Sequence, residues 1–109
     1  MQRVRNLILT VAAVLGLLFV PAVANAADTG WSSKPMYDAP NQSSGYLGAV
    51  DPHRSVSLIC WTDSAWFAGT NRWFLIQAPV YSSYWRRYFQ TQGWMSANHI
   101  SNQYAVRHC

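Results

Sequence analysis

One stretch of the 109-residue chain concentrates side chains that are suited to binding a ligand. It reads Tyr81-Ser82-Ser83-Tyr84-Trp85-Arg86-Arg87-Tyr88-Phe89. Aromatic rings stack on sugar faces and on other planar groups, and the forked guanidinium of arginine binds carboxylates or phosphates. Tyrosine and tryptophan also offer a large contact area at a low cost in conformational entropy. The candidate ligand-binding residues are therefore Tyr81, Tyr84, Trp85, Arg86, Arg87 and Tyr88.

The same aromatic side chains also fit two purely structural roles. The three tyrosines and the tryptophan follow the i, i+3, i+4, i+7 spacing of one buried face of a short helix. Alternatively, they decorate an extended hairpin and pair across its two strands. Aromatic stripes pack more often than they bind. The observation that decides between these roles is whether the side chains are exposed together or buried.

The histidines and cysteines form no recognisable catalytic or metal-binding set. The spacings of His53, His99 and His108 match no common zinc motif. A cysteine–histidine hydrolase would need a free Cys60 beside a histidine and an orienting polar group, which nothing in the local sequence supports. Small ribonucleases use histidine with glutamate or with a second histidine, and glutamate is absent here. We therefore expect no catalytic residue, no metal and no cofactor, with a two-histidine enzyme as the remaining enzymatic alternative.

The first 26 residues have the organisation of a cleaved secretory signal peptide. Arg3 and Arg5 form a positive n-region, an apolar run follows over residues 7–20, and Ala24-Asn25-Ala26 is a small-residue cleavage pattern. An uncleaved anchor is the alternative, but a spanning helix needs roughly 20 apolar residues and this run is shorter. The mature chain is thus expected to begin at Ala27, with no stable membrane insertion after cleavage.

The charge of the mature chain is small. The whole sequence carries a formal charge of +4, but residues 27–109 contain only six basic and four acidic side chains, a difference of two. Nucleic-acid binding usually requires a clustered basic face, and Arg86-Arg87 is the only cluster. We therefore expect no nucleic-acid partner.

The two cysteines, Cys60 and Cys109, are expected to form a disulfide. Export places the chain in an oxidising compartment, and the count of cysteines is even. A domain of this size buries only about 60% of its unfolded surface and is marginal without a covalent link. Closing this loop stabilises the fold by on the order of 4 kcal/mol in the chain-entropy description. The expected location is extracellular or associated with the cell wall.

Short apolar runs between turn-forming residues predict a domain built from strands. Strands are expected at 36–37, 46–50, 55–61, 72–77 and 93–96, and Val56, Leu58 and Cys60 fall on one face of the strand 55–61. Loops or turns are expected at 38–45, 51–54 and 62–71, after a flexible lead-in at 27–33. Residues 72–100 are expected to form a long hairpin followed by one helical turn, with residues 78–92 as an insertion between its two strands. One helical or 3₁₀ turn is expected at 97–100, and residues 103–107 alternate like a further strand. This pattern favours a small all-β barrel or sandwich.

Four short motifs occur in order between Lys34 and Gln103. They are Met36-Tyr37-Asp38-Ala39-Pro40, Val56-Ser57-Leu58-Ile59-Cys60-Trp61, Trp73-Phe74-Leu75-Ile76, and Gly93-Trp94-Met95 with Ala97 and Ile100. Their order resembles that of the bacterial SH3-like (SH3b) family. The resemblance implies an SH3-like barrel of five to six short antiparallel strands with one 3₁₀ turn over residues 34–109. It also implies an exported domain without catalytic residues of its own that binds cell-wall or peptide ligands.

The chain departs from this family pattern in two places. The turn at 51–54 lacks the glycine that is common before the central strand, and the connection at 78–92 is longer than usual. We expect a secreted binding module for peptidoglycan, another wall glycan or a peptide. Its partner would be a wall polymer or a secreted or surface protein. The alternatives are a secreted interaction partner, inhibitor or toxin without a wall ligand, and a small secreted hydrolase or ribonuclease.

Overall fold

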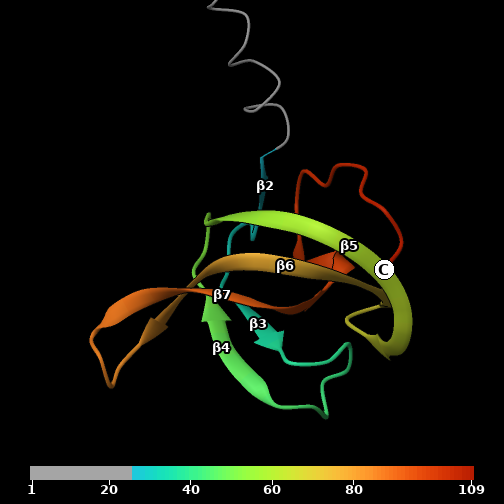
Figure 1. Ribbon diagram of the computed structural model, residues 1–109. Helices are drawn as coiled ribbons and strands as arrows, with labels where there is room; N and C mark the ends of the chain where they lie inside the picture. Colours follow the sequence, from blue (N-terminus) through green and yellow to red (C-terminus); the bar gives the residue numbers. More distant parts are fainter. Residues whose placement is uncertain (1–25) are drawn as a thin grey trace, which may run out of the picture.

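The computed structural model describes residues 26–109 (Figure 1). The predicted signal peptide, residues 1–26, therefore lies outside the described residues except for Ala26. The described chain contains the following elements: β2 (Ala27–Asp28), β3 (Lys34–Tyr37), β4 (Tyr46–Val50), β5 (Ser55–Phe67), β6 (Thr70–Ser82), β7 (Arg87–Ser96) and the 3₁₀ turn η2 (Ala97–His99).

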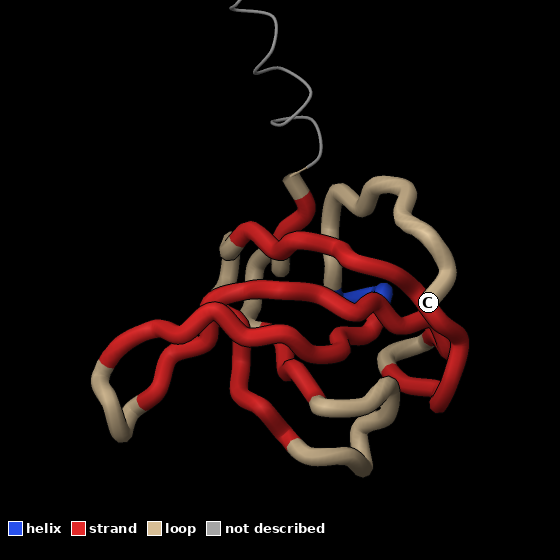
Figure 2. Tube along the Cα trace, in the orientation of Figure 1, coloured by secondary structure: helices blue, strands red, loops and turns tan. Residues whose placement is uncertain are grey.

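These strands form one antiparallel sheet in the order β2-β5-β6-β7-β3-β4. The sheet curls into a half-barrel, as the tube in Figure 2 shows. The all-β class and the single 3₁₀ turn expected from the sequence are confirmed. The loop at 38–45 and the tight turn at 51–54 also lie where the turn-forming residues predict them.

The core lies on one face of this sheet because apolar side chains alternate along its strands. On β5, the predicted inward residues Val56, Leu58 and Cys60 are all buried. Trp73 is fully buried, and its indole N–H donates to the carbonyl of Ala65 at 2.8 Å, so its one polar group is satisfied. The remaining core side chains come from the other strands, from η2 and from the residue that follows it: Ala27, Met36, Val50, Phe74, Ile76, Ala78, Val80, Met95, Ala97 and Ile100.

The loop predicted at 62–71 is wrong. Strand β5 continues to Phe67 and β6 begins at Thr70, so only Ala68 and Gly69 connect them. Both connecting residues have positive φ angles, of 57° and 86°, which suit a two-residue turn with the twist of a hairpin. Shifts in strand register interrupt the pairing on either side of Cys60–Asp63, and these bulges hide the regular alternation that would have marked a strand in the sequence.

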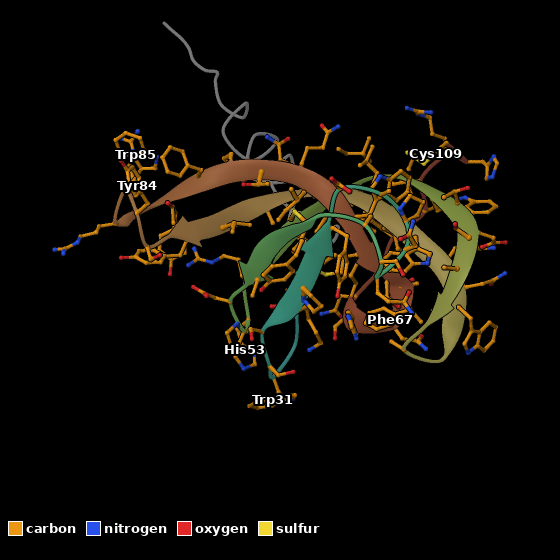
Figure 3. The ribbon with its side chains drawn as sticks, turned by 90° about the horizontal axis from the view of Figure 1, so that it is seen from below. Trp31, His53, Phe67, Tyr84, Trp85 and Cys109 are labelled. Atoms are coloured by element: carbon orange, nitrogen blue, oxygen red, sulfur yellow. A yellow bond between two sulfur atoms is a disulfide. The ribbon has the colours of Figure 1, made fainter. Side chains whose placement is uncertain are left out.

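The long hairpin predicted within 72–100 is present, but the insertion expected at 78–92 is mostly strand. Strands β6 and β7 pair without a register shift from Trp73 opposite Ser96 to Ser82 opposite Arg87, and only residues 83–86 form the turn. Pro79 lies inside β6, where proline would ordinarily argue against a strand. Beyond Gln77 the described part of β5 no longer pairs with β6, so this stretch of β6 is an open edge that tolerates proline. The resulting hairpin projects from the half-barrel (Figures 1 and 3).

The flexible lead-in expected at 27–33 is wrong for its first residues, which are paired and buried. Ala27 and Asp28 pair with β5 as strand β2, and Ala27 is fully buried. Thr29 is buried as well, and its hydroxyl donates to the carbonyl of Asp51 and accepts from the N–H of Arg54. Residues 27–29 therefore belong to the folded domain and are not a flexible lead-in.

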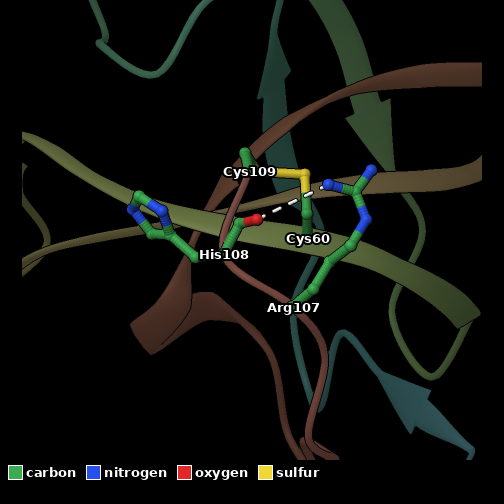
Figure 4. Close-up of a disulfide and its surroundings, with 4 residues drawn as sticks. All are labelled: Cys60, Arg107, His108 and Cys109. Atoms are coloured by element: carbon green, nitrogen blue, oxygen red, sulfur yellow. Dashed lines mark hydrogen bonds between the residues drawn. A yellow bond between two sulfur atoms is a disulfide. The ribbon is translucent and has the colours of Figure 1, made fainter.

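The C-terminal segment is held against β5 rather than forming the strand predicted at 103–107. Its last residues pair locally, with the N–H of Trp61 donating to Arg107 at 3.0 Å and the N–H of Cys109 donating to Trp61 at 2.8 Å. The predicted disulfide between Cys60 and Cys109 is confirmed, with Cα atoms 5.1 Å apart (Figure 4). The bridge and the local pairing together fasten the end of the chain to a central strand.

Candidate functional site

The six candidate residues, called the tip residues below, cluster at the end of the β6–β7 hairpin. Tyr81 is the second-to-last residue of β6, and Arg87 and Tyr88 are the first two residues of β7. Tyr84, Trp85 and Arg86 lie in the turn between the two strands. The backbone N–H of Arg86 donates to the carbonyl of Ser82 at 2.7 Å, and the N–H of Trp85 donates to the Ser82 hydroxyl at 3.2 Å. These two bonds close the turn and present its side chains outward.

All six tip residues are exposed. The exposed fraction is 83% for Tyr84, 64% for Trp85, 48% for Tyr81 and 46% for Tyr88. The buried helical face considered from the spacing is therefore wrong, and the extended hairpin is correct. Tyr81 and Tyr88 are directly opposite, with ring centroids 5.2 Å apart, and Tyr84 contacts Trp85 edge-on at 4.9 Å. Figure 3 shows this second pair at the end of the hairpin, far from Phe67.

The tip carries positive charge that no acidic side chain balances. Within residues 26–109 the ion pairs join Arg54 to Asp51 and Arg72 to Asp63, so neither Arg86 nor Arg87 takes part in one. Arg87 lies over the ring of Phe89, with 4.6 Å from Cζ to the ring centroid. Unpaired guanidinium groups beside exposed rings can bind an anionic substituent of a stacked ligand.

The turn between β4 and β5 contacts the β6–β7 hairpin at Tyr88, close to its tip. The hydroxyl of Tyr88 donates to Oδ2 of Asp51, and the guanidinium of Arg54 lies 4.9 Å from the centroid of the Tyr88 ring. Arg54 also pairs with Asp51 at 3.5 Å. The hydrogen bond to the Asp51 carboxylate raises the pKa of Tyr88 above its ordinary value, because the protonated phenol is the form that donates.

A groove of about 660 Å³ opens beside this contact and was not predicted from the sequence. Its lining, called the turn groove below, consists of the β4–β5 turn Asp51–Arg54 together with Ser55, Ser57, Gln77, Pro79 and Gln90. A sequence signal for it exists on β5, where Ser55 and Ser57 alternate with the apolar Val56 and Leu58, which is the period of a strand with one solvated face. Residues 77–80 and 88–93 show no such alternation.

The structure does not bring the three histidines into one site. His53 lies in the β4–β5 turn against Trp31, with ring centroids 4.7 Å apart. His99 contacts Phe67, and His108 contacts Trp61. Partial burial lowers the pKa of His99, and the nearby charge of Lys34 lowers it further.

The described residues also bear on metal binding and membrane insertion. Residues 26–109 contain no group of three histidine, cysteine, aspartate or glutamate side chains arranged to hold a metal ion. Both cysteines are in the disulfide. No helix within the same residues is long and apolar enough to cross a membrane.

Comparison with known proteins returns no match to a family model, to a curated protein or to a solved structure. The description of the site therefore depends on the geometry of the chain itself: a half-barrel that presents an exposed aromatic and basic hairpin tip beside a polar groove.

Proposed function

We propose that the protein is a secreted, non-catalytic binding module that recognises a cell-wall polymer or a peptide ligand through the tip residues. The observation that supports this proposal is the joint exposure of Tyr81, Tyr84, Trp85 and Tyr88 beside two arginines that form no ion pair among the described residues. Exposure of large aromatic rings to water is energetically unfavourable, and contiguous exposed apolar surface commonly marks an interaction site.

The scaffold is suited to such a role. The hairpin bearing the tip residues continues two of the central strands, and Asp51 and Arg54 hold Tyr88 from the side. A site held in this way loses little conformational entropy when a ligand binds. The disulfide and the signal-like N-terminal sequence support an extracellular or wall-associated location. We further propose that the half-barrel is of the SH3-like type, on the order of its sequence motifs.

The test is a pull-down of the exported protein with purified peptidoglycan and with isolated wall polymers. A Trp85→Ala/Arg86→Ala variant is expected to bind about tenfold more weakly, because central aromatic and arginine side chains contribute most to interface energy. Trp66→Ala/Arg107→Ala removes the same two residue types from exposed positions outside the hairpin and is the matched control. Equal binding by the wild type and the Trp85→Ala/Arg86→Ala variant, called the tip variant below, would contradict the proposal.

A secreted protein partner without a wall ligand is the competing outcome. Affinity capture from culture fluid distinguishes it, because a protein partner would be recovered in a fixed stoichiometric ratio and wall polymer would not. Recovery of one such protein, lost with the tip variant, would retain the tip as the binding site but replace the wall ligand.

A further inference from the structure

The turn groove and the hairpin tip lie along the same face of the sheet. Pro79 is opposite Gln90, and two residues further along the same strands Tyr81 is opposite Tyr88. Side chains two residues apart point to the same side of a strand and are about 7 Å apart. The floor of the groove therefore continues directly into the Tyr81–Tyr88 pair, on the face opposite the buried residues Ala78 and Val80.

We propose that the turn groove binds an uncharged, hydroxyl-rich glycan segment, with the adjoining sugar stacked on the Tyr81–Tyr88 pair. This inference builds on the proposed binding function and specifies its ligand class as a polysaccharide. Its polar groove residues, Ser55, Ser57, Gln77 and Gln90, lie outside the six tip residues and were not candidate binding residues in the sequence.

The polar groups on the groove floor are suited to sugar hydroxyls. Ser55, Ser57, Gln77 and Gln90 are exposed, and none of these side chains hydrogen-bonds to another residue in the described part of the chain. Hydroxyl and amide groups each donate and accept, which matches the alternating donors and acceptors of a sugar edge. A volume of about 660 Å³ lies within the usual range for small-ligand sites and has room for a short oligosaccharide.

The charge of the groove favours a neutral ligand. The carboxylate of Asp51 and the guanidinium of Arg54 pair with each other and both contact Tyr88, so the groove wall carries no net charge from them. An anion entering the groove would approach Asp51, and a cation would approach Arg54. On the hairpin, the positive charge that takes part in no ion pair among the described residues lies at Arg86 and Arg87, which do not line the groove. An acidic substituent would therefore be placed at the tip rather than in the groove.

The backbone geometry disfavours an extended peptide in the same groove. Peptides commonly bind sheets by adding a strand to an open edge, where backbone groups are unpaired. The groove crosses the face of the sheet, where Ser57 pairs with Gln77 and Pro79 with Gln90. The open edge of β6 beside it contains Pro79, which has no N–H to donate to an added strand. Recognition there depends on side chains, and polar side chains beside aromatic rings are better matched to a glycan.

The test is a titration of the exported, isotopically labelled protein monitored by nuclear magnetic resonance. The probes are two neutral oligosaccharides, a β-1,4-linked tetramer of N-acetylglucosamine and one of glucose, with tetra-alanine as the peptide probe. At least one tetramer is expected to shift the side-chain amide signals of Gln77 and Gln90, and tetra-alanine is not. A Gln77→Ala/Gln90→Ala variant is expected to lose about tenfold in affinity for that tetramer, from two lost hydrogen bonds.

The controls separate this inference from the proposed function. Gln42→Ala, in the exposed 38–45 loop, removes the same side chain elsewhere and is expected to bind as the wild type. Groove signals unmoved by both tetramers, undiminished affinity in the double variant, or a response to tetra-alanine alone would each overturn the glycan groove. If wall binding still depends on Trp85 and Arg86 in that case, the proposed function stands. If wild-type and tip-variant proteins bind wall equally while the groove binds a tetramer, only the role of the tip fails.

Discussion

The hydroxyl of Tyr88 donates to the carboxylate of Asp51, a residue 37 positions earlier in the chain. This bond joins the first residues of β7 to the turn between β4 and β5, two segments that are not neighbours in the sheet order. Arg54 completes the contact by pairing with Asp51 and lying over the Tyr88 ring. The tip and the turn groove therefore share one set of side chains at their boundary.

This contact predicts a specific dependence of stability on alkaline pH. Because the folded state raises the pKa of Tyr88, the contribution of its hydrogen bond is complete below the unfolded-state value, near 10. The contribution is lost as the pH rises through the higher folded-state value. Thermal unfolding measured from pH 8 to pH 11.5 should show a steeper loss for the wild type than for Tyr88→Phe. Tyr84→Phe, at the exposed turn, should follow the wild type. Parallel curves for wild type and Tyr88→Phe would contradict the contact.

His99 predicts an opposite dependence on the acidic side. Burial and the charge of Lys34 lower the pKa of His99 in the folded state, so the unfolded chain binds a proton more readily. The corresponding stability is present above the ordinary value of 6.5 and is lost as the pH falls through the folded-state value. Replacing His99 with Phe, which retains a ring beside Phe67, should flatten the decline in unfolding temperature between pH 7 and pH 5.

The matched variant for His99 is His53→Asn. His53 has a positive φ angle of 54°, a conformation that asparagine tolerates, and it lies in an exposed turn. This variant should retain the acidic decline of the wild type. If it removes the decline and His99→Phe does not, the titrating group has been wrongly assigned.

The disulfide predicts a large loss of stability on reduction. In the exported protein, the intact mass should be two hydrogens below that of the reduced chain, and no thiol should react before reduction. Reduction, or the Cys60→Ser/Cys109→Ser variant, should lower the free energy of unfolding by up to about 4 kcal/mol. Denaturant titration with and without reductant measures this effect. The double serine variant should be insensitive to reductant, and an unchanged wild-type midpoint would contradict a stabilising bridge.

The side chain of Val80 on β6 leaves no room for a side chain at Gly48 on β4. It has a φ angle of 130°, and an added Cβ would lie 2.5 Å from Cγ1 of Val80. Gly48→Ala should therefore destabilise the domain by about 1–3 kcal/mol through overpacking and backbone strain. Denaturant unfolding of Gly48→Ala, Val80→Ala and the double variant provides the test. The double variant should lose less than the sum of the two single losses, because Val80→Ala removes the clashing methyl. Strict additivity would show that the two residues do not touch.

Local pattern was sufficient for the short elements of the fold. The sequence predicted the strand Tyr46–Val50 with its bounds, the alternation of Val56, Leu58 and Cys60, and the turn that became η2. It also predicted the disulfide, because chemistry and compartment leave two cysteines few other roles. In each case the information lies within a few residues, where periodicity and turn propensity act.

The long hairpins depended on contacts that local pattern does not contain. Register shifts in β5 and the proline in β6 resemble loop signals, yet pairing with neighbouring strands keeps both segments extended. Tertiary pairing overrode the turn signals of residues 62–71, and it extended the hairpin predicted within 72–100 through most of the insertion at 78–92.

The chemical identity of the candidate site was already in the sequence, since it lists the aromatic and basic side chains of residues 81–88. Whether they pack or face solvent was not, because the same spacing fits a buried helix and an exposed hairpin. Only the tertiary structure decided for exposure, by pairing Tyr81 with Tyr88 at the end of β6 and β7. It alone also created the turn groove, which gathers residues between 51 and 90 from one turn and three strands. Such a surface arises from strand register and chain reversal, which place distant residues side by side.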